Sequence, residues 1–123
     1  MNGSETILLV DDEDDIIDVG AELLETLGYK VLTAKNGEEA IKLYKENIDI
    51  IDVLVIDMVM PRMSGSELYK RLKALNSEIK VLLASGYSID GEATKILEQG
   101  CNGFIQKPFG IVELSQGIRN ILD

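Results

Sequence analysis

Five polar residues of this 123-residue chain stand at the ends of strand-like runs, and their side chains could do chemistry together. They are Asp11, Asp12, Asp57, Ser85 and Lys107. Carboxylate oxygens are the ligands that hard divalent cations prefer, and an ionised aspartate is itself a nucleophile. A lysine and a hydroxyl group could hold the oxygens of an anionic group beside such a cation. The residue types therefore suggest attack by a carboxylate on an anionic, metal-held group.

The apolar runs predict five strands of one parallel sheet. They cover residues 6–10, 30–34, 53–57, 80–85 and 104–107. The run at 53–56, Val-Leu-Val-Ile, shows no polar alternation, which is typical of a strand covered by helices on both faces. Because the carboxyl ends of parallel strands meet at one edge of the sheet, we expect the five polar residues to converge there, where the strand order reverses.

Apolar residues at helical spacing predict five helices between and after these strands. The first follows the acids at 11–15 and ends at Gly28, and the second covers 38–47 after an Asn36-Gly37 turn. The third begins at an N-cap, Ser64, with Glu67 completing a capping box. The remaining two lie at 90–99 and along the stripe 111, 114, 118 and 121. Alternating strands and helices predict one α/β domain, doubly wound, over residues 1–123.

Each polar residue also has a simpler explanation. Acids favour the N-termini of helices, so the run at 11–15 could serve only the helix that follows it. Ser85 could be an ordinary turn residue, and Lys107 could be a solvated lysine, although the proline after it restricts its backbone to extended conformations. Asp57 alone could open a turn. Their recurrence at the strand ends favours a shared site.

Composition excludes several classes of function. The chain has 22 acidic and 12 basic residues, a net charge of −10, which disfavours direct contact with nucleic acid or an anionic membrane. Its apolar runs are too short for a membrane span, and its N-terminus lacks a signal pattern. Cys101, the single cysteine, fits a reducing compartment. We therefore expect a cytoplasmic globular protein.

Several ordered segments resemble the receiver domain of two-component response regulators, over essentially the whole chain. They are Ile-Leu-Leu-Val-Asp-Asp-Glu at 7–13, Val-Leu-Val-Ile-Asp-Met-Val-Met-Pro at 53–61, Ser-Gly at 64–65, Val-Leu-Leu-Ala-Ser-Gly at 81–86 and Lys-Pro-Phe at 107–109. The resemblance implies a flavodoxin-like fold, with five parallel strands in the order 2-1-3-4-5 and five helices. It also implies that Asp57 accepts a phosphoryl group, with Mg²⁺ held by Asp11, Asp12, Asp57 and the backbone carbonyl of Val59.

The same resemblance implies that Ser85 and Lys107 hold the phosphoryl oxygens and that Ser85 and Phe104 form the conformational switch. Two residues depart from the common family pattern. Val59 is apolar where many members carry a polar side chain that can orient water, so we expect slow self-dephosphorylation. Phe104 replaces a common tyrosine, so a switch here would depend on packing alone.

Other functions remain open on the sequence alone. A phosphatase of the haloacid dehalogenase type also uses an aspartate nucleophile and Mg²⁺, but Asp57-Met58-Val59 lacks its second acid. A flavin carrier would need a phosphate-binding loop where this chain has acids at 11–15. A third alternative is a pseudo-receiver that serves only as an interaction module.

Partners follow from the resemblance and from the residues. The chain contains no histidine, so a phosphohistidine donor must lie on a histidine kinase or phosphotransfer domain elsewhere. We expect no direct nucleic acid or membrane partner, and an output partner or attached domain at the last two helices. A phosphorylation-dependent homodimer is compatible with this arrangement. The segment Ala-Ser-Gly-Tyr-Ser at 84–88 resembles receivers of hybrid sensor histidine kinases.

Overall fold

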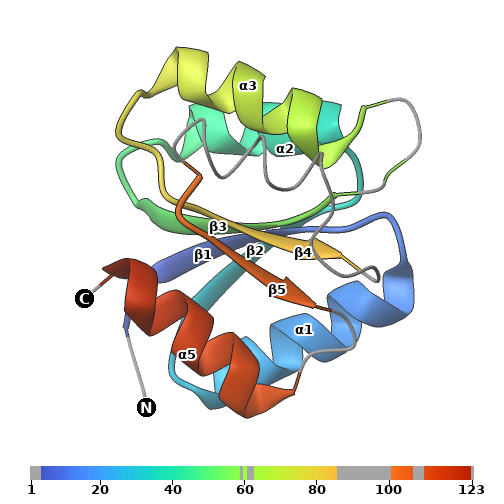
Figure 1. The fold of residues 1–123 in the computed structure, drawn as a ribbon, viewed down its shortest axis with the longest axis vertical. Helices are drawn as coiled ribbons and strands as arrows, with labels where there is room; N and C mark the ends of the chain where they lie inside the picture. The colour runs from blue at the N-terminus through green and yellow to red at the C-terminus, as the bar shows by residue number, and fades with distance from the viewer. Residues whose placement is uncertain (1–3, 59, 61–62, 86–100, 107–109, 123) are drawn as a thin grey trace.

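The computed structural model shows a five-stranded parallel sheet in the order β2-β1-β3-β4-β5, as predicted (Figure 1). It describes residues 4–58, 60, 63–85, 101–106 and 110–122. The strands are β1 (Thr6–Val10), β2 (Lys30–Ala34), β3 (Ile51–Asp57), β4 (Val81–Ser85) and β5 (Gly103–Gln106). The change of direction in strand order lies between β1 and β3, so the strand that leads into Asp11 and the strand that ends in Asp57 are neighbours.

Helices cover both faces of the sheet, which confirms the doubly wound α/β architecture (Figure 1). One face carries α1 (Asp14–Thr26) and α5 (Ile111–Leu122), and the other carries α2 (Gly37–Glu46) and α3 (Gly65–Leu75). The helix predicted at 90–99 falls outside the described residues. Among those that are described, no helix has the length and apolarity that a membrane crossing requires.

Side chains of alternate residues in the central strands pack into two separate hydrophobic cores, one on each face of the sheet. In β3, Leu54 and Ile56 pack with α2 and α3, whereas Val53 and Val55 pack with α1 and α5. All four are 1% exposed or less. The unbroken apolar run therefore reflects burial on both sides, because each pleat direction meets a helical layer.

Short-range polar contacts and one glycine fix the helix ends. Asn36 caps α2 by accepting a hydrogen bond from the Glu39 amide at 2.8 Å, so the predicted turn at 36–37 is wrong and α2 begins at Gly37. Ser64 caps α3 in the same way, at 3.2 Å from the Glu67 amide. Gly28 has φ 95°, which confirms it as the left-handed residue that ends α1.

The register between β1 and β3 shifts by one residue near their N-terminal ends. Thr6 pairs with Ile51, but Ile7 pairs with Val53, so Asp52 is the extra residue. The Asp52 carboxylate accepts a hydrogen bond from the Thr6 amide at 2.8 Å. Beyond the shift the pairing is regular as far as Val10 and Ile56, and Asp11 and Asp57 are the next residues along the two strands.

Glu5 and Arg119 join the start of β1 to α5. Arg119 Nη2 lies 2.6 Å from Glu5 Oε2, with 12% and 29% of the two side chains exposed, and the guanidinium also lies 5.8 Å from the centre of the Tyr29 ring. The hydrogen bond from Arg119 is the main reason that the pKa of Glu5 falls below its ordinary value. The pair ties together three separate segments of the chain.

Glu5→Gln should lower the free energy of unfolding by about 1 kcal/mol near neutral pH, because the Arg119 guanidinium then donates to a neutral acceptor and loses its counter-charge. A lowered pKa in the folded state stabilises the protein above the unfolded-state value of 4.5 and loses this effect as pH falls through the folded-state value. The difference from wild type should therefore shrink below about pH 4.5 in urea unfolding. Lys35→Gln, which breaks an exposed pair with Asp14, is the control and should leave the free energy of unfolding nearly unchanged, because water screens exposed pairs.

Candidate functional site

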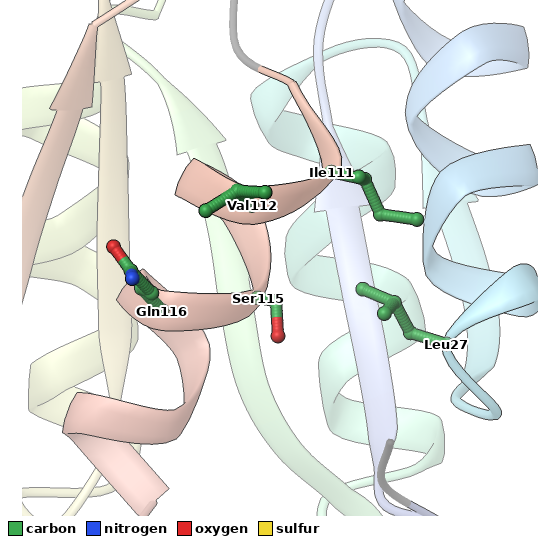
Figure 2. A pocket seen from close by; sticks show the side chains of 5 residues that line it. All are labelled: Leu27, Ile111, Val112, Ser115 and Gln116. Carbon is green, nitrogen blue, oxygen red and sulfur yellow. The ribbon is translucent and has the colours of Figure 1, made fainter. Parts of the chain in front are cut away.

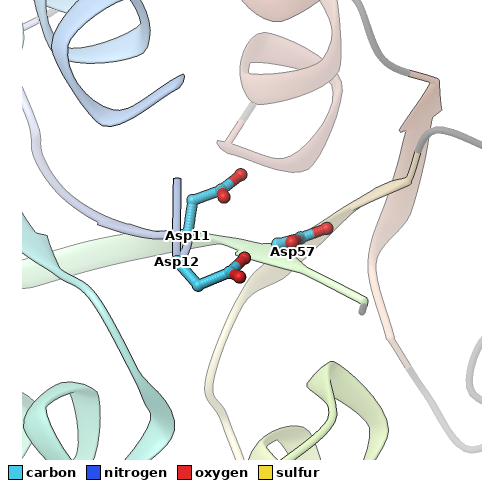
Figure 3. Close-up of side chains that lie close together, drawn as sticks. All are labelled: Asp11, Asp12 and Asp57. Atoms are coloured by element: carbon cyan, nitrogen blue, oxygen red, sulfur yellow. The ribbon is translucent and has the colours of Figure 1, made fainter. Parts of the chain in front are cut away.

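Three carboxylates meet at the C-terminal ends of β1 and β3 (Figure 3). Asp11 and Asp12 follow β1 directly, and Asp57 is the last residue of β3. One carboxylate oxygen from each residue lies within 4.8 Å of the others. The structure thus brings together three of the five polar residues that the sequence singled out.

Backbone hydrogen bonds extend the sheet past the strand ends and hold these residues in place. The Asp11 amide donates to the Ala34 carbonyl of β2 at 3.1 Å. The Met58 amide, directly after Asp57, donates to the Ala84 carbonyl of β4 at 2.9 Å. The backbone at Asp11 and beside Asp57 is therefore held by the neighbouring strands.

Burial concentrates the negative charge of the cluster. Asp11 is 2% exposed and Asp57 5% exposed, whereas Asp12 is exposed. Asp11 Oδ1 accepts a hydrogen bond from the Glu13 amide at 3.0 Å, which orients its carboxylate. Like charges repel more strongly where water is excluded, so the cluster favours binding of a cation.

The donor set fits a small hard cation. Three carboxylate oxygens from fixed backbone match the oxygen ligands of Mg²⁺, which commonly uses one or two carboxylates and keeps several waters. The exposure of Asp12 leaves one side of the cluster open to water or to an incoming group. Such a site can both bind a cation and offer the buried Asp57 carboxylate as a nucleophile.

The acid run at 11–15 divides between two roles. Asp11 and Asp12 belong to the carboxylate cluster, whereas Asp14 and Asp15 lie in the first turn of α1. Asp14 also pairs with Lys35, whose Nζ lies 2.9 Å from its Oδ1 and whose pKa is raised by that hydrogen bond. The simpler explanation of the run, as helix-terminal acids, therefore applies to its second half.

The remaining predicted site residues are described only in part. Ser85 is the last residue of β4 and pairs with Gln106 of β5, so its backbone lies at the same end of the sheet as Asp57, but its side chain is outside the description. Val59 and Lys107 also fall outside the described residues. Their predicted contacts with metal and phosphoryl oxygens stay predictions.

Phe104 lies on β5, opposite Leu83 of β4. Its side chain is half-buried and packs against the core beneath α2 and α3. Its register position is two residues before the Ser85–Gln106 pair. The predicted switch aromatic therefore lies on the strand next to the one that ends in Ser85.

Sequence reasoning assigned no role to Gly65, the first residue of α3, which lies against the backbone of Asp57 and Met58. The sequence did contain a signal for this contact. Glycine is unfavourable within a helix, so a glycine directly after the N-cap Ser64 suggests that another part of the chain approaches closely there.

A mainly apolar cavity of about 290 Å³ lies between the end of α1 and α5 (Figure 2). None of the three clustered aspartates lines it. Its lining residues are Leu27, Ile111, Val112, Ser115 and Gln116. None of these lining residues carries a charge, and their exposed surface is mainly apolar, so the cavity lacks the charged groups of a metal or phosphoryl site.

Comparisons with known proteins agree with this arrangement. A family model described as the response regulator receiver domain matches residues 7–119. Sensor kinase CckA of Brucella abortus is 35% identical over 123 residues, which are 100% of this chain and 13% of that protein. Response regulator SaeR of Staphylococcus aureus is 34% identical over 116 residues, 94% of this chain and 50% of that protein. The chain thus spans half or less of these relatives.

Solved structures show the same fold. A response regulator receiver domain protein from Clostridium thermocellum superposes with a TM-score of 0.91 at 31% identity, covering 96% of this chain and 94% of that one. The receiver domain of the hybrid histidine kinase CckA gives a TM-score of 0.80 at 35% identity, covering 96% and 99%. TrrA from Thermotoga maritima, solved in complex with Mg²⁺ and BeF, gives 0.84 at 29% identity, covering 95% and 98%. With its matching fold, its carboxylate cluster and a family model over most of its length, the chain belongs to the response regulator receiver domain family.

Proposed function

We propose that this chain is the phosphoacceptor domain of a two-component phosphorelay and that Asp57 takes the phosphoryl group. The observation that carries the proposal is the buried Asp57 carboxylate at the end of the central strand, within 4.8 Å of two further carboxylate oxygens. An ionised aspartate needs no general base to attack phosphorus. Phosphoryl transfer then requires positioning and neutralisation of charge, which a site of this kind can supply.

Asp11, Asp12 and Asp57 would hold Mg²⁺, together with the backbone carbonyl of Val59. A bound Mg²⁺ supplies positive charge against the oxygens of the transferring group. The buried Asp11 and Asp57 carboxylates would supply two ligands, and the exposed Asp12 carboxylate would supply a third at the side that is open to water. Ser85, the last residue of β4, and Lys107, which comes next in sequence after β5, would hold the remaining phosphoryl oxygens.

Phosphorylation by a small phosphodonor tests the proposal. The protein is incubated with acetyl phosphate and Mg²⁺, and intact mass is followed by peptide mapping. We expect one phosphoryl group, on the peptide that contains Asp57, and no incorporation in EDTA. Because Val59 has no polar side chain to orient water, the label should decay slowly after the donor is removed. Absence of label with Mg²⁺ present, or label on another residue, would contradict the proposal.

The phosphoryl group would be read out through β4, β5 and the last two helices. Ser85 ends β4, and Phe104 packs half-buried on the adjacent strand, so movement of Ser85 toward a phosphoryl group would change the space open to Phe104. Beryllofluoride, a phosphoryl mimic, should therefore shift amide NMR signals along residues 101–122 as well as at Asp57. Signals that change at Asp57 alone would show that the site and this surface are not coupled.

The donor would be a phosphohistidine on a histidine kinase or phosphotransfer domain, and the output partner an attached domain or separate protein at the last two helices. Similarity to a sensor kinase and to a response regulator supports both arrangements, with residues 1–123 as one receiver unit. The free, buried Cys101 supports a reducing, cytoplasmic setting. Phosphorylation could also promote a homodimer, which light scattering of the phosphorylated protein would detect.

A further inference from the structure

The N-terminus of α3 lies unusually close to the backbone that carries Asp57. A Cβ atom built on Gly65 would lie 2.6 Å from the Asp57 carbonyl oxygen and 2.7 Å from the Met58 Cα. Both contacts are with backbone atoms, which cannot turn away as the end of a side chain can. Only glycine permits this approach without movement of the strand end.

The approach is fixed by hydrogen bonds on both sides. The Gly65 amide donates to the Met58 carbonyl at 2.9 Å, and Ser64 Oγ accepts from the Glu67 amide at 3.2 Å. The Met58 amide in turn donates to β4, through the Ala84 carbonyl at 2.9 Å. The peptide after Asp57 is therefore held between α3 and β4.

We propose that Gly65 is a positioning residue for phosphoryl transfer at Asp57. By letting α3 rest directly on the Asp57–Met58 backbone, it sets where the Asp57 carboxylate stands relative to Asp11 and Asp12. This inference rests on the proposed function, because the reaction it serves is the one proposed for Asp57. Gly65 touches no reacting group, and its effect reaches the reaction only through the backbone.

The expected displacement of the backbone in Gly65→Ala is large enough to slow phosphorylation strongly. Restoring an ordinary contact of 3.4 Å from 2.6 Å requires a relative movement of about 0.8 Å between the Asp57 carbonyl and the first turn of α3. A misplacement of about 1 Å in a reacting group can cost roughly a hundredfold in rate, because in-line attack depends on geometry. We therefore expect Gly65→Ala to lower the rate of phosphorylation by at least about tenfold at saturating Mg²⁺ and acetyl phosphate.

Gly117→Ala is the matched control. Gly117 is also a helical glycine packed against the sheet, and its added Cβ would meet only side-chain atoms, Leu82 Cδ2 at 3.1 Å and Ile105 Cγ2 at 3.2 Å. This control should keep the rate of phosphorylation within about twofold of wild type, because it moves no backbone near the carboxylates. Thermal unfolding of both variants shows whether each is folded under the assay conditions.

A second readout does not depend on turnover. Amide NMR spectra of the metal-free proteins should show Asp57 and Met58 displaced in Gly65→Ala and unchanged in Gly117→Ala. If Gly65→Ala does not fold, Ser64→Ala decides, because loss of the cap frees the first turn of α3 without adding a Cβ clash. It should then shift the same two amides and slow phosphorylation by several fold.

The outcomes separate this inference from the function on which it rests. If wild type is labelled and folded Gly65→Ala is labelled at a rate within about twofold of it, Gly65 has no positioning role although the proposed function stands. Equal labelling of Ser64→Ala and wild type, where Gly65→Ala is unfolded, overturns the inference in the same way. Absence of label on wild type removes the proposed function and this inference together.

Discussion

Asp57→Asn should accept no phosphoryl group from acetyl phosphate, because a neutral amide is not a nucleophile toward phosphorus. The substitution changes little in size, so the backbone held by α3 and β4 should keep its place. Intact-mass spectrometry of wild type and variant, treated side by side with Mg²⁺ and donor, measures the difference. We expect complete loss of the label within detection, the largest change among the effects expected here.

Asp52→Asn is the control for this substitution. Asp52 lies on the same strand, is exposed, and accepts a hydrogen bond from the Thr6 amide that an asparagine oxygen can also accept. This variant should be labelled like wild type. Label retained on Asp57→Asn at the wild-type level would show that another residue accepts the phosphoryl group, and the assignment of the site would be wrong.

Mg²⁺ should stabilise the fold without any phosphoryl group. Two buried carboxylates and one exposed carboxylate lie within 4.8 Å of one another, and only folding brings Asp57 close to Asp11 and Asp12, so this part of the repulsion is confined to the folded state. A cation that binds only the folded state contributes about 1.4 kcal/mol at ten times its Kd. For a domain of this size that contribution corresponds to roughly 4 °C in thermal midpoint. Thermal unfolding in EDTA and in excess Mg²⁺ measures it.

Asp12→Asn separates repulsion from cation binding. Removing one charge of the cluster should raise the midpoint in EDTA and weaken the response to Mg²⁺, two changes of opposite sign. Asp49→Asn removes an exposed acid from the segment between α2 and β3 and should leave the Mg²⁺ response unchanged. A wild-type midpoint indifferent to Mg²⁺, with Asp12→Asn less stable than wild type in EDTA, would contradict the electrostatic account of the site.

The positions of the strands could be predicted from the sequence because burial on both faces of a sheet requires an unbroken run of apolar residues. The run at 53–56 is apolar at every position since Leu54 and Ile56 meet one helical layer while Val53 and Val55 meet the other. The same pattern located the strand ends, and with them Asp11, Asp12 and Asp57. Parallel pairing then brings those ends to one edge, which needs no knowledge of side-chain packing.

Details that depend on tertiary packing were not accessible in this way. Ile111 was expected on the buried stripe of α5, but it is 37% exposed and lies at the first position of that helix. Asp11 and Asp12 are adjacent and identical, yet one is buried and the other exposed. The close approach of Gly65 to Asp57 is likewise a distance between elements, which helical or strand periodicity does not encode.

Because of the register shift at Asp52, we expect the chain to tolerate insertions before β3 better than changes within it. Pairing of β1 with β3 is regular from Ile7–Val53 to Val10–Ile56, and this count alone sets Asp11 beside Asp57. Residues added at 47–50 would lie before the register shift at Asp52. They would leave the number of residues between Val53 and Asp57 unchanged. A single deletion within 53–56 would move Asp57 back by one position and turn the strand's side chains to opposite faces. A fluorescent tag or affinity loop therefore belongs at 47–50, at the opposite end of the sheet from the carboxylates.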